Sequence, residues 1–302
     1  MSHTTHSILS GYMFVLGATA IWSGNFIVAR GLSNYTPPVS LAFYRWSVAV
    51  IVFTPFAIKN LVQEWPVIKK HIPYFSITSF LGITTFNTLI YCAGHTTSAL
   101  NLSLIAITFP IFIILFSRIL YKERLTVKRG FGIVLVLTGV LFLLTKGNIS
   151  NLLNISFNIG DLWMLIAAII FAVYSLFLRN KPEGISIKAL QFCTFTLGLS
   201  FLFPFFLWEH AGVHGFFLNR TTIPAILYIG IFPSLCAFVL WSKSIVILGP
   251  SKAGMVYYTL PLFSGLAGYL FLHENIGMIH LYSMILIFTG IIAANHESKK
   301  QQ

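Results

Sequence analysis

The sequence has very little charge. Only 9% of its 302 residues are Asp, Glu, Lys or Arg, and 57% are hydrophobic. A soluble domain carries about 25% charged residues, so this shortage excludes an ordinary soluble protein and indicates an integral membrane protein. Acidic residues are scarcest, with seven Asp and Glu against nineteen Lys and Arg.

The few acidic residues lie where we expect connections or helix ends: Glu64, Glu123, Asp161, Glu183, Glu209, Glu274 and Glu297. No HExxH motif, aspartate pair or Ser/His/Asp arrangement falls in the apolar segments, which argues against an intramembrane enzyme. We therefore predict no catalytic residue, no metal site and no cofactor. The predicted spans also have no Asp or Glu in the middle of the membrane that could take up a proton.

The sequence also has few cysteines, and its first ten residues lack the basic residues of a signal peptide. The three cysteines, Cys92, Cys193 and Cys236, lie in apolar runs, without the spacing of a disulfide framework or a metal site. Residues 1–10 contain no Lys or Arg. The first apolar run is therefore predicted to be a retained membrane helix and not a cleaved signal peptide.

What the sequence has in abundance is apolar runs of spanning length, since about 20 residues cross the hydrocarbon core. We predict ten transmembrane helices, near residues 11–30, 39–58, 72–93, 99–121, 127–145, 159–178, 187–208, 223–242, 253–272 and 276–295. No connection is long enough for a soluble domain. The longest are 59–71 and 209–222.

The two halves of the chain repeat each other. Pro110, Glu123 and Gly139 recur as Pro261, Glu274 and Gly290, each displaced by 151 residues. The first and sixth predicted helices match at an offset of 149. Each copy has five spans, and because five is odd the second copy must have the opposite orientation in the membrane. The predicted fold class is an all-α integral membrane protein with ten transmembrane helices in two inverted five-helix repeats.

This repeat divides the chain into a tail at 1–10, a first repeat at 11–145, a connection at 146–158, a second repeat at 159–295 and a tail at 296–302. With both tails inside, fifteen Lys and Arg lie on the inner side and three on the outer side. The positive-inside rule therefore predicts cytoplasmic termini and an extracytoplasmic 146–158 connection. It also explains the basic excess without a nucleic-acid partner.

The Pro-x12-Glu-x15-Gly element in each copy and the stretch from Trp22 to Phe26 resemble the EamA family of the drug/metabolite transporter superfamily. The likeness extends over residues 11–295. It implies transport of amino acids, related metabolites or drugs across a bacterial inner membrane, often outward. It also implies a cavity lined by the predicted helices 1, 3, 4, 6, 8 and 9, with helices 5 and 10 at the periphery.

Polar and aromatic residues on these cavity helices are the candidate substrate-binding residues: Trp22, Asn25, Asn87, Tyr91, Tyr174, Trp241, Tyr257 and Tyr258. Asn side chains in membrane helices also join neighbouring helices by hydrogen bonds, and Tyr and Trp near helix ends also form interfacial belts. Tyr91 and Trp241 occupy equivalent positions in the two copies. In an alternating-access carrier such positions would suit two gates.

Arg45 is the charged residue that falls clearly inside a predicted span. Its side chain can extend outward to the membrane surface, or it can anchor a substrate carboxylate. The resemblance implies an arginine in this helix whatever the substrate, which favours the structural role. Pro110 and Pro261 fall inside predicted helices 4 and 9, where each is expected to kink its helix and to act as a hinge or as a static bend.

The function predicted from these features is secondary transport of small organic metabolites, most closely amino acids or related compounds, outward by alternating access. The protein is expected in the inner membrane as a monomer or homodimer. The alternatives are a passive channel of the same architecture and a non-transporting membrane enzyme or assembly component.

Overall fold

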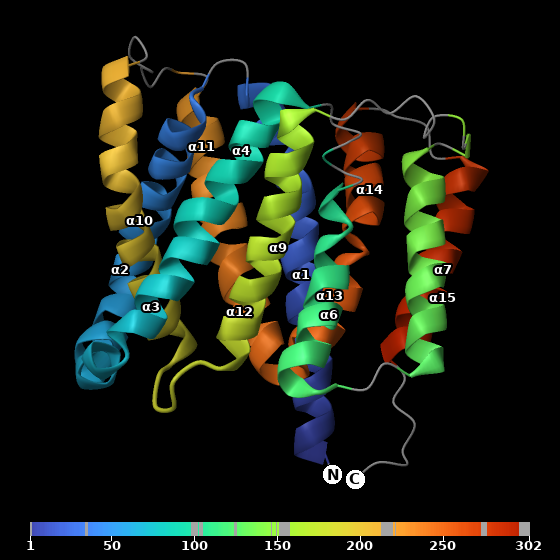
Figure 1. Ribbon diagram of the computed structural model, residues 1–302, viewed down its shortest axis with the longest axis horizontal. Helices are drawn as coiled ribbons and strands as arrows, with labels where there is room; N and C mark the ends of the chain where they lie inside the picture. The colour runs from blue at the N-terminus through green and yellow to red at the C-terminus, as the bar shows by residue number, and fades with distance from the viewer. Residues whose placement is uncertain are drawn as a thin grey trace.

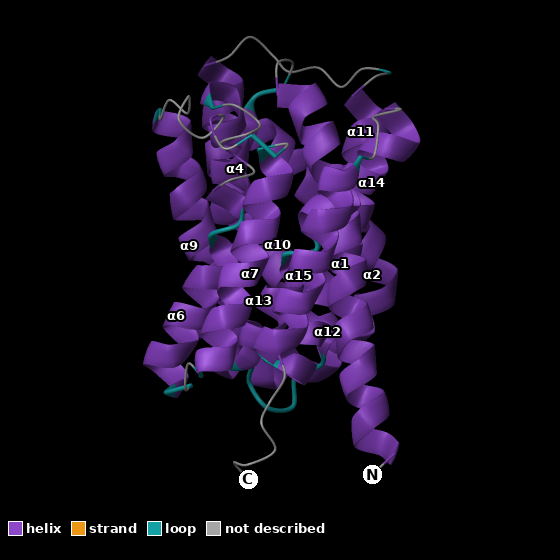
Figure 2. Cartoon of the chain, turned by 90° about the vertical axis from the view of Figure 1, so that its right-hand side faces the viewer, coloured by secondary structure: helices purple, strands orange, loops and turns teal. Residues whose placement is uncertain are grey.

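A computed structural model describes residues 2–33, 36–97, 102, 105–123, 126–145, 147–148, 150, 158–212, 220, 222–272 and 277–295. Within these ranges it describes every side chain except those of residues 2–7, 25–33, 267–268 and 271–272. All secondary structure in the described part of the chain is helical, and Figure 2 shows the helices running in roughly one direction.

The first half contains α1 (Ser2–Ser33), α2 (Pro38–Lys70), α3 (Ile72–Ser79), the π-helical segment η1 (Phe80–Thr85), α4 (Phe86–Thr96), α6 (Phe109–Tyr121) and α7 (Val127–Leu144). The second half contains α9 (Ile159–Arg179), α10 (Ile187–Gly212), α11 (Thr222–Ile229), the π-helical segment η2 (Gly230–Cys236), α12 (Ala237–Leu248), α13 (Pro250–Tyr257), α14 (Leu260–Leu272) and α15 (Met278–Asn295).

Among the described residues, seven helices are long and apolar enough to cross a membrane: 38–70, 72–96, 127–144, 159–179, 187–212, 222–248 and 278–295. The shorter apolar helices at 8–24 and 109–121 coincide with the predicted first and fourth spans. The predicted ninth span is divided between α13 and α14. The count of ten spans and the inverted orientation of the repeats therefore stay predictions.

The predicted end of the second span is wrong. The region 59–71, predicted as a connection, is almost wholly helical, because α2 continues to Lys70 with Pro55 and Pro66 inside it. Residues 2–10 of the predicted tail are helical, and their place outside the first span stays a prediction. Leu61 and Ile68 pack into the core while Val62 and Trp65 are exposed. Burial on one side of the helix outweighs the polar residues that suggested a loop.

Figure 1 places the start of α1 and the ends of α2, α6 and α15 at the same end of the molecule. Because the chain begins and ends at the same end of the molecule, an even number of membrane crossings between its two tails agrees with this arrangement. The basic residues Lys69 and Lys70 are in the last turn of α2, and Arg118 is in the last turn of α6. The fold therefore gathers these cations at one end, as the positive-inside pattern requires.

The two π-helical segments begin 150 residues apart, at Phe80 and Gly230. Both contain a glycine where another helix lies against the backbone. A Cβ on Gly82 would collide with the ring of Tyr174, and one on Gly230 would lie 2.6 Å from Val48 Cβ. A π-turn inserts an extra residue into a helix and often marks a functional site. The repeat thus preserves an irregularity of the backbone as well as the helix order.

The glycine of the repeated Pro-Glu-Gly element brings α7 and α15 together at one edge of the molecule (Figure 1). A Cβ on Gly290 would lie 2.7 Å from the carbonyl oxygen of Gly132, and one on Gly139 would lie 3.0 Å from that of Ser283. Small residues allow such close approach of membrane helices. The peripheral position expected for the fifth and tenth predicted helices agrees with this edge pair.

The proline of the element follows a break in the backbone and does not lie inside a continuous helix, as the sequence had suggested. Turns at Ile107 and Thr108 precede α6, and turns at Tyr258 and Thr259 separate α13 from α14. Pro110 and Pro261 then occupy the second residues of α6 and α14. Proline is tolerated in a first helical turn because that N–H has no intrahelical acceptor.

The described acidic residues lie at helix ends, in helix caps or in a connecting turn. Glu209, near the end of α10, accepts hydrogen bonds from the backbone N–H groups of Val39 and Ser40 at the start of α2. Reciprocally, Glu64 near the end of α2 accepts one from the N–H of Ser186, just before α10. Negative charge is favourable at a helix N-terminus, so this helix pair is fastened at both ends.

Glu123 joins the two halves at the end of the molecule where α6 terminates. Its carboxylate accepts hydrogen bonds from Arg179 Nη1 at 2.6 Å and from Ser251 Oγ at 2.7 Å, and it lies 3.5 Å from Arg129 Nη1. Burial raises the pKa of Glu123, but the hydrogen bonds from Ser251 and Arg179 and the nearby arginine charges outweigh it. The pKa therefore lies below its ordinary value.

Candidate functional site

A pocket lies between the two halves of the chain. Its free volume is small, about 40 Å³, which is room for only a few water molecules. The lining residues come from α1, α2, α4, the segment before α6, α6, α9, α12 and α13: Trp22, Arg45, Phe86, Asn87, Ile90, Ala106, Phe109, Met164, Ala168, Phe171, Phe238 and Tyr257.

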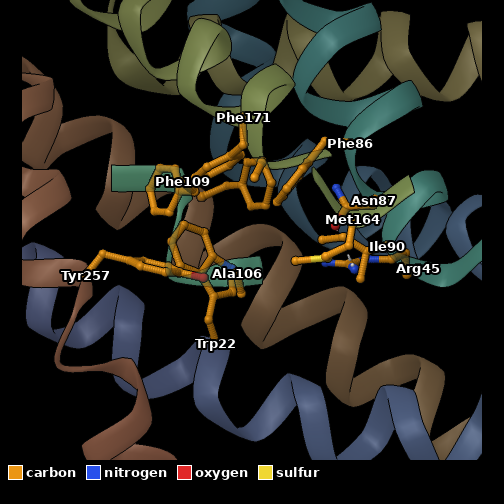
Figure 3. Close-up of a pocket in the computed structure, with 12 residues that line it drawn as sticks. Trp22, Arg45, Phe86, Asn87, Ile90, Ala106, Phe109, Met164, Phe171 and Tyr257 are labelled. Atoms are coloured by element: carbon orange, nitrogen blue, oxygen red, sulfur yellow. Dashed lines mark hydrogen bonds between the residues drawn. The ribbon is translucent and has the colours of Figure 1, made fainter. Parts of the chain in front are cut away.

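One end of the pocket is aromatic. Figure 3 shows Trp22, Phe109, Phe171 and Tyr257 grouped together, with Phe86 pointing toward them. Phe109 meets Tyr257 edge to face with ring centroids 4.4 Å apart. Phe86 stacks on Phe171 at 4.3 Å. Such contacts fix ring orientations, so this end presents a rigid apolar surface.

Trp22 is held in place by a hydrogen bond across the repeats. Its Nε1–H donates to the carbonyl oxygen of Pro233, in η2, at 2.9 Å. Its ring contacts Phe171 and Phe238 edge to face, with centroids 5.7 Å away in both cases. The indole therefore ties α1 to the irregular part of the second repeat and presents an apolar face to the pocket.

The other end of the pocket is polar and is built around Arg45 (Figure 3). Arg45 is 1% exposed. Its Nε donates to Ser234 Oγ at 2.6 Å, and its Nη1 donates to Asn87 Oδ1 at 3.0 Å. Nη1 also donates to the hydroxyl of Tyr91. All three partners are neutral, and they come from η2 and α4.

The prediction that Arg45 extends to the membrane surface is wrong. Its hydrogen bonds direct the guanidinium inward, to the pocket that it lines. Among the described residues it forms no ion pair, since the ion pairs there join Glu123 to Arg129 and to Arg179. A buried charge without a counter-ion is costly. Neutral hydrogen bonds compensate only part of that cost.

The predicted binding residues divide into two groups. Trp22, Asn87 and Tyr257 line the pocket together with Arg45. The others surround it or lie elsewhere: Tyr91 bonds to Arg45, Tyr174 packs on Gly82, Trp241 contacts Trp22 with ring centroids 5.6 Å apart, and Tyr258 is fully buried. Trp241 Nε1 donates to Ser175 Oγ at 3.1 Å. The side chain of Asn25 lies outside the described residues.

Sequence reasoning missed the phenylalanines and the small residues of the pocket, because it searched for polar side chains. The repeat itself carried a usable signal. Phe171 is the counterpart of Trp22 at the offset of 149, and Ala106 is the counterpart of Tyr257 at the offset of 151. Both members of each pair line the same pocket. Equivalent positions of the two repeats therefore meet in one pocket.

The described part of the chain is helical and apolar, with a pocket between the two repeated halves. The chain belongs to the EamA-like transporter family, whose domain matches twice, at residues 9–145 and 158–295. The resemblance found in the sequence is thereby confirmed, and the protein is a multi-pass membrane protein of a transporter family.

Relatives from bacteria and archaea extend over almost the whole chain. "Uncharacterized transporter YyaM" of Bacillus subtilis is 23% identical over 95% of this chain and 94% of its own. An "Uncharacterized transporter" of Archaeoglobus fulgidus is 24% identical over 96% and 97%. A crystal structure of a protein aligns with a TM-score of 0.72 over 94% of this chain and 96% of that chain at 20% identity, which shows a common fold.

Proposed function

We propose that the protein is a secondary transporter that moves small organic metabolites across the bacterial inner membrane by alternating access. The observation that carries the proposal is the pocket between the two halves, with an arginine at one end and aromatic rings at the other. A few convergent polar groups in a mostly apolar pocket are typical of sites for small molecules.

The helices beside the pocket support alternating access over a static channel. The backbone is broken just before Pro110 and Pro261, and both π-helical segments lie at equivalent repeat positions. Irregular backbone of this kind is common in transporters, where it surrounds the central site. Pro110 and Pro261 stay proposed hinges, each now placed next to a break where small changes in backbone angles can redirect a helix.

Tyr91 and Trp241 stay proposed gates at the two sides of the site. Both side chains are buried, at 5% and 0% exposure, and a buried position favours a gate over an anchor at the membrane surface. Amino acids and related compounds are the proposed substrates, with outward transport, on the strength of the family resemblance. We propose cytoplasmic termini from the distribution of Lys and Arg.

Counterflow in proteoliposomes tests the proposal. Vesicles loaded with unlabelled solute should accumulate the labelled solute transiently and to a saturable extent, because a carrier exchanges one molecule for another. The solutes to be screened are amino acids, their oxo-acid and hydroxy-acid analogues and aromatic acids. Linear, non-saturable flux in both directions would favour a channel, and absence of flux for every solute would contradict the proposed transport.

A further inference from the structure

We infer that the solute bound in this pocket is an organic anion: a carboxylate joined to an apolar, preferably aromatic body, without an ammonium group. The inference rests on the proposed transport function for its physiological meaning, but it concerns binding and can be tested without transport. Among the proposed amino acids and related compounds, it selects the related compounds that lack an ammonium group, such as aryl- and alkyl-substituted carboxylic acids.

The first step is the charge of the site. Arg45 places a guanidinium cation at one end of the pocket, and its three hydrogen bonds engage Nε and Nη1. Within the described part of the chain, Nη2 has no hydrogen-bond partner and the guanidinium has no carboxylate. A carboxylate presents two acceptor oxygens to the planar fork of an arginine. An anionic solute would therefore supply the missing counter-ion.

The second step is the position of the acidic residues. None of the twelve lining residues is acidic. Glu64 and Glu209 cap helices, Glu123 pairs with Arg129 and Arg179, and Asp161 belongs to the capping box of α9. Glu183 lies exposed in the connection between α9 and α10. The pocket consequently offers a positive charge and no negative one.

The third step concerns the geometry of an amino acid. Its ammonium and carboxylate are attached to the same carbon, so an amino acid bound to Arg45 would place its ammonium at the same end of the pocket. The pocket-lining neighbours there are Asn87, Ile90 and Met164 (Figure 3). Ile90 and Met164 are apolar, and the side-chain oxygens of Asn87, Tyr91 and Ser234 already accept hydrogen bonds from Arg45. An ammonium would lose its hydration and lie beside a guanidinium of like charge.

The fourth step is the apolar end. The aromatic rings could hold a cation by cation–π interaction, but in Figure 3 they are grouped away from Arg45. The ammonium of an amino acid whose carboxylate binds Arg45 would lie at the arginine end, away from these rings. The rings instead form a rigid apolar surface for the body of the solute. A planar ring stacks well on such a surface.

Four solutes with matched parts test the inference on the purified full-length protein in lipid nanodiscs. They are 3-phenylpropanoate, L-phenylalanine, phenethylamine and acetate. The first has a carboxylate and a phenyl ring, the second adds an ammonium group, the third has the ring and an ammonium but no carboxylate, and the fourth has a carboxylate without a ring. Equilibrium dialysis gives Kd, and the thermal shift gives an independent ranking. We expect 3-phenylpropanoate to bind at least about tenfold more tightly than phenylalanine, with phenethylamine and acetate weaker still.

Variants link the ranking to the arginine. Arg45→Gln should weaken binding of 3-phenylpropanoate by about tenfold or more, and Arg45→Lys should retain part of it, because the charge remains but the planar fork is lost. Arg118→Gln is the matched control, since it removes an exposed cation from the end of α6 and should leave Kd unchanged. If Arg45→Gln does not fold, the ranking of the four solutes on the wild-type protein decides.

Several results would overturn the inference. On the wild-type protein these are phenylalanine or acetate binding as tightly as 3-phenylpropanoate, phenethylamine binding more tightly than phenylalanine and 3-phenylpropanoate, or no binding of any of the four solutes at millimolar concentration. A folded Arg45→Gln protein with an unchanged Kd for 3-phenylpropanoate would also overturn it.

Failure of the proposed function would look different. Binding with the expected ranking but without counterflow would sustain the anion site and contradict the carrier, whereas counterflow of cations alone would sustain a carrier and contradict the anion site.

Discussion

Arg45 and its repeat counterpart Thr194 occupy equivalent places in α2 and α10, yet only one of them is charged. Around Arg45 are Asn87, Tyr91 and Ser234, and it hydrogen-bonds to all three. At an offset of 149 to 150 residues, the corresponding positions hold Thr194, Ala237, Trp241 and Thr84. The two hydroxyl groups of the second set already have hydrogen-bond acceptors. Thr194 Oγ1 donates to the carbonyl of Gln191, and Thr84 Oγ1 donates to that of Gly198.

This difference shows how an approximately symmetric scaffold produces an asymmetric site. The backbone features are repeated, including the π-helical segments and the breaks before Pro110 and Pro261. The charge is not repeated. The pocket between the two copies is therefore polar at the Arg45 end and aromatic at the other.

Placing a charge at the second position should have the largest effect. Thr194 is fully buried, and none of the counterparts of Asn87, Tyr91 and Ser234 supplies a comparable set of acceptors. In Thr194→Arg we expect the uncompensated guanidinium to cost several kcal/mol, on the order of 3–5 kcal/mol, and to abolish accumulation of folded protein. Size-exclusion chromatography in detergent measures it.

Thr194→Val is the matched control for Thr194→Arg, because it keeps the shape of the side chain and removes one local hydrogen bond. It should remain monodisperse with a Tm close to that of the wild-type protein. A folded Thr194→Arg protein with an unchanged Tm would show that the second position tolerates a charge as well as the first does.

The next effect concerns close packing at the π-helical segment of the first half. Gly82→Ala places a methyl group against the ring of Tyr174, and overpacking of this kind costs about 1–3 kcal/mol. Gly94→Ala is the control, since a Cβ there has no atom within 4 Å and alanine is the better helix former. We expect a lower Tm for Gly82→Ala and an unchanged or higher Tm for Gly94→Ala. Equal Tm values would mean that η1 and α9 are not in close contact.

A smaller effect should distinguish the two tryptophans that meet at the pocket. Trp22→Phe leaves the carbonyl of Pro233 without the indole donor, which costs about 1–3 kcal/mol for a buried group. Trp241→Phe loses the same volume, but its acceptor Ser175 Oγ still donates to the carbonyl of Phe171. We therefore expect the larger fall in Tm for Trp22→Phe. A larger fall in Tm for Trp241→Phe than for Trp22→Phe would contradict the importance of the hydrogen bond by which Trp22 links α1 to η2.

The smallest effect should come from Glu123, which joins the halves at the end of the molecule. Because the folded-state pKa of Glu123 is lowered, its contribution to stability is present above the unfolded-state pKa and is lost as the pH falls through the folded-state pKa. Glu123→Gln should lower stability at neutral pH by about 1 kcal/mol or less and flatten the fall of Tm below the ordinary carboxyl pKa of 4.5. Parallel Tm curves for both proteins from neutral to acidic pH would contradict this role.

The family, the helical class and the repeat could be predicted from the sequence, because each depends on local composition or on spacing along the chain. Apolar runs identify helices that lie in lipid, and the Pro110, Glu123 and Gly139 pattern is visible at an offset of 151 wherever the helices lie in space. The choice of Trp22, Asn87 and Tyr257 as candidate residues also came from helix assignment and polarity.

Only the tertiary structure decided what Arg45 does and which residues form the pocket. The direction of a long side chain depends on partners distant in the chain, and Ser234 lies 189 residues from Arg45. Phe171 and Phe238 carry no polar signal, and they become pocket residues because their rings meet Trp22 of α1 in the folded protein. The extension of α2 to Lys70 was likewise decided by burial of Ile68. The sequence determined the elements and their repetition, whereas contacts between the two copies determined the site.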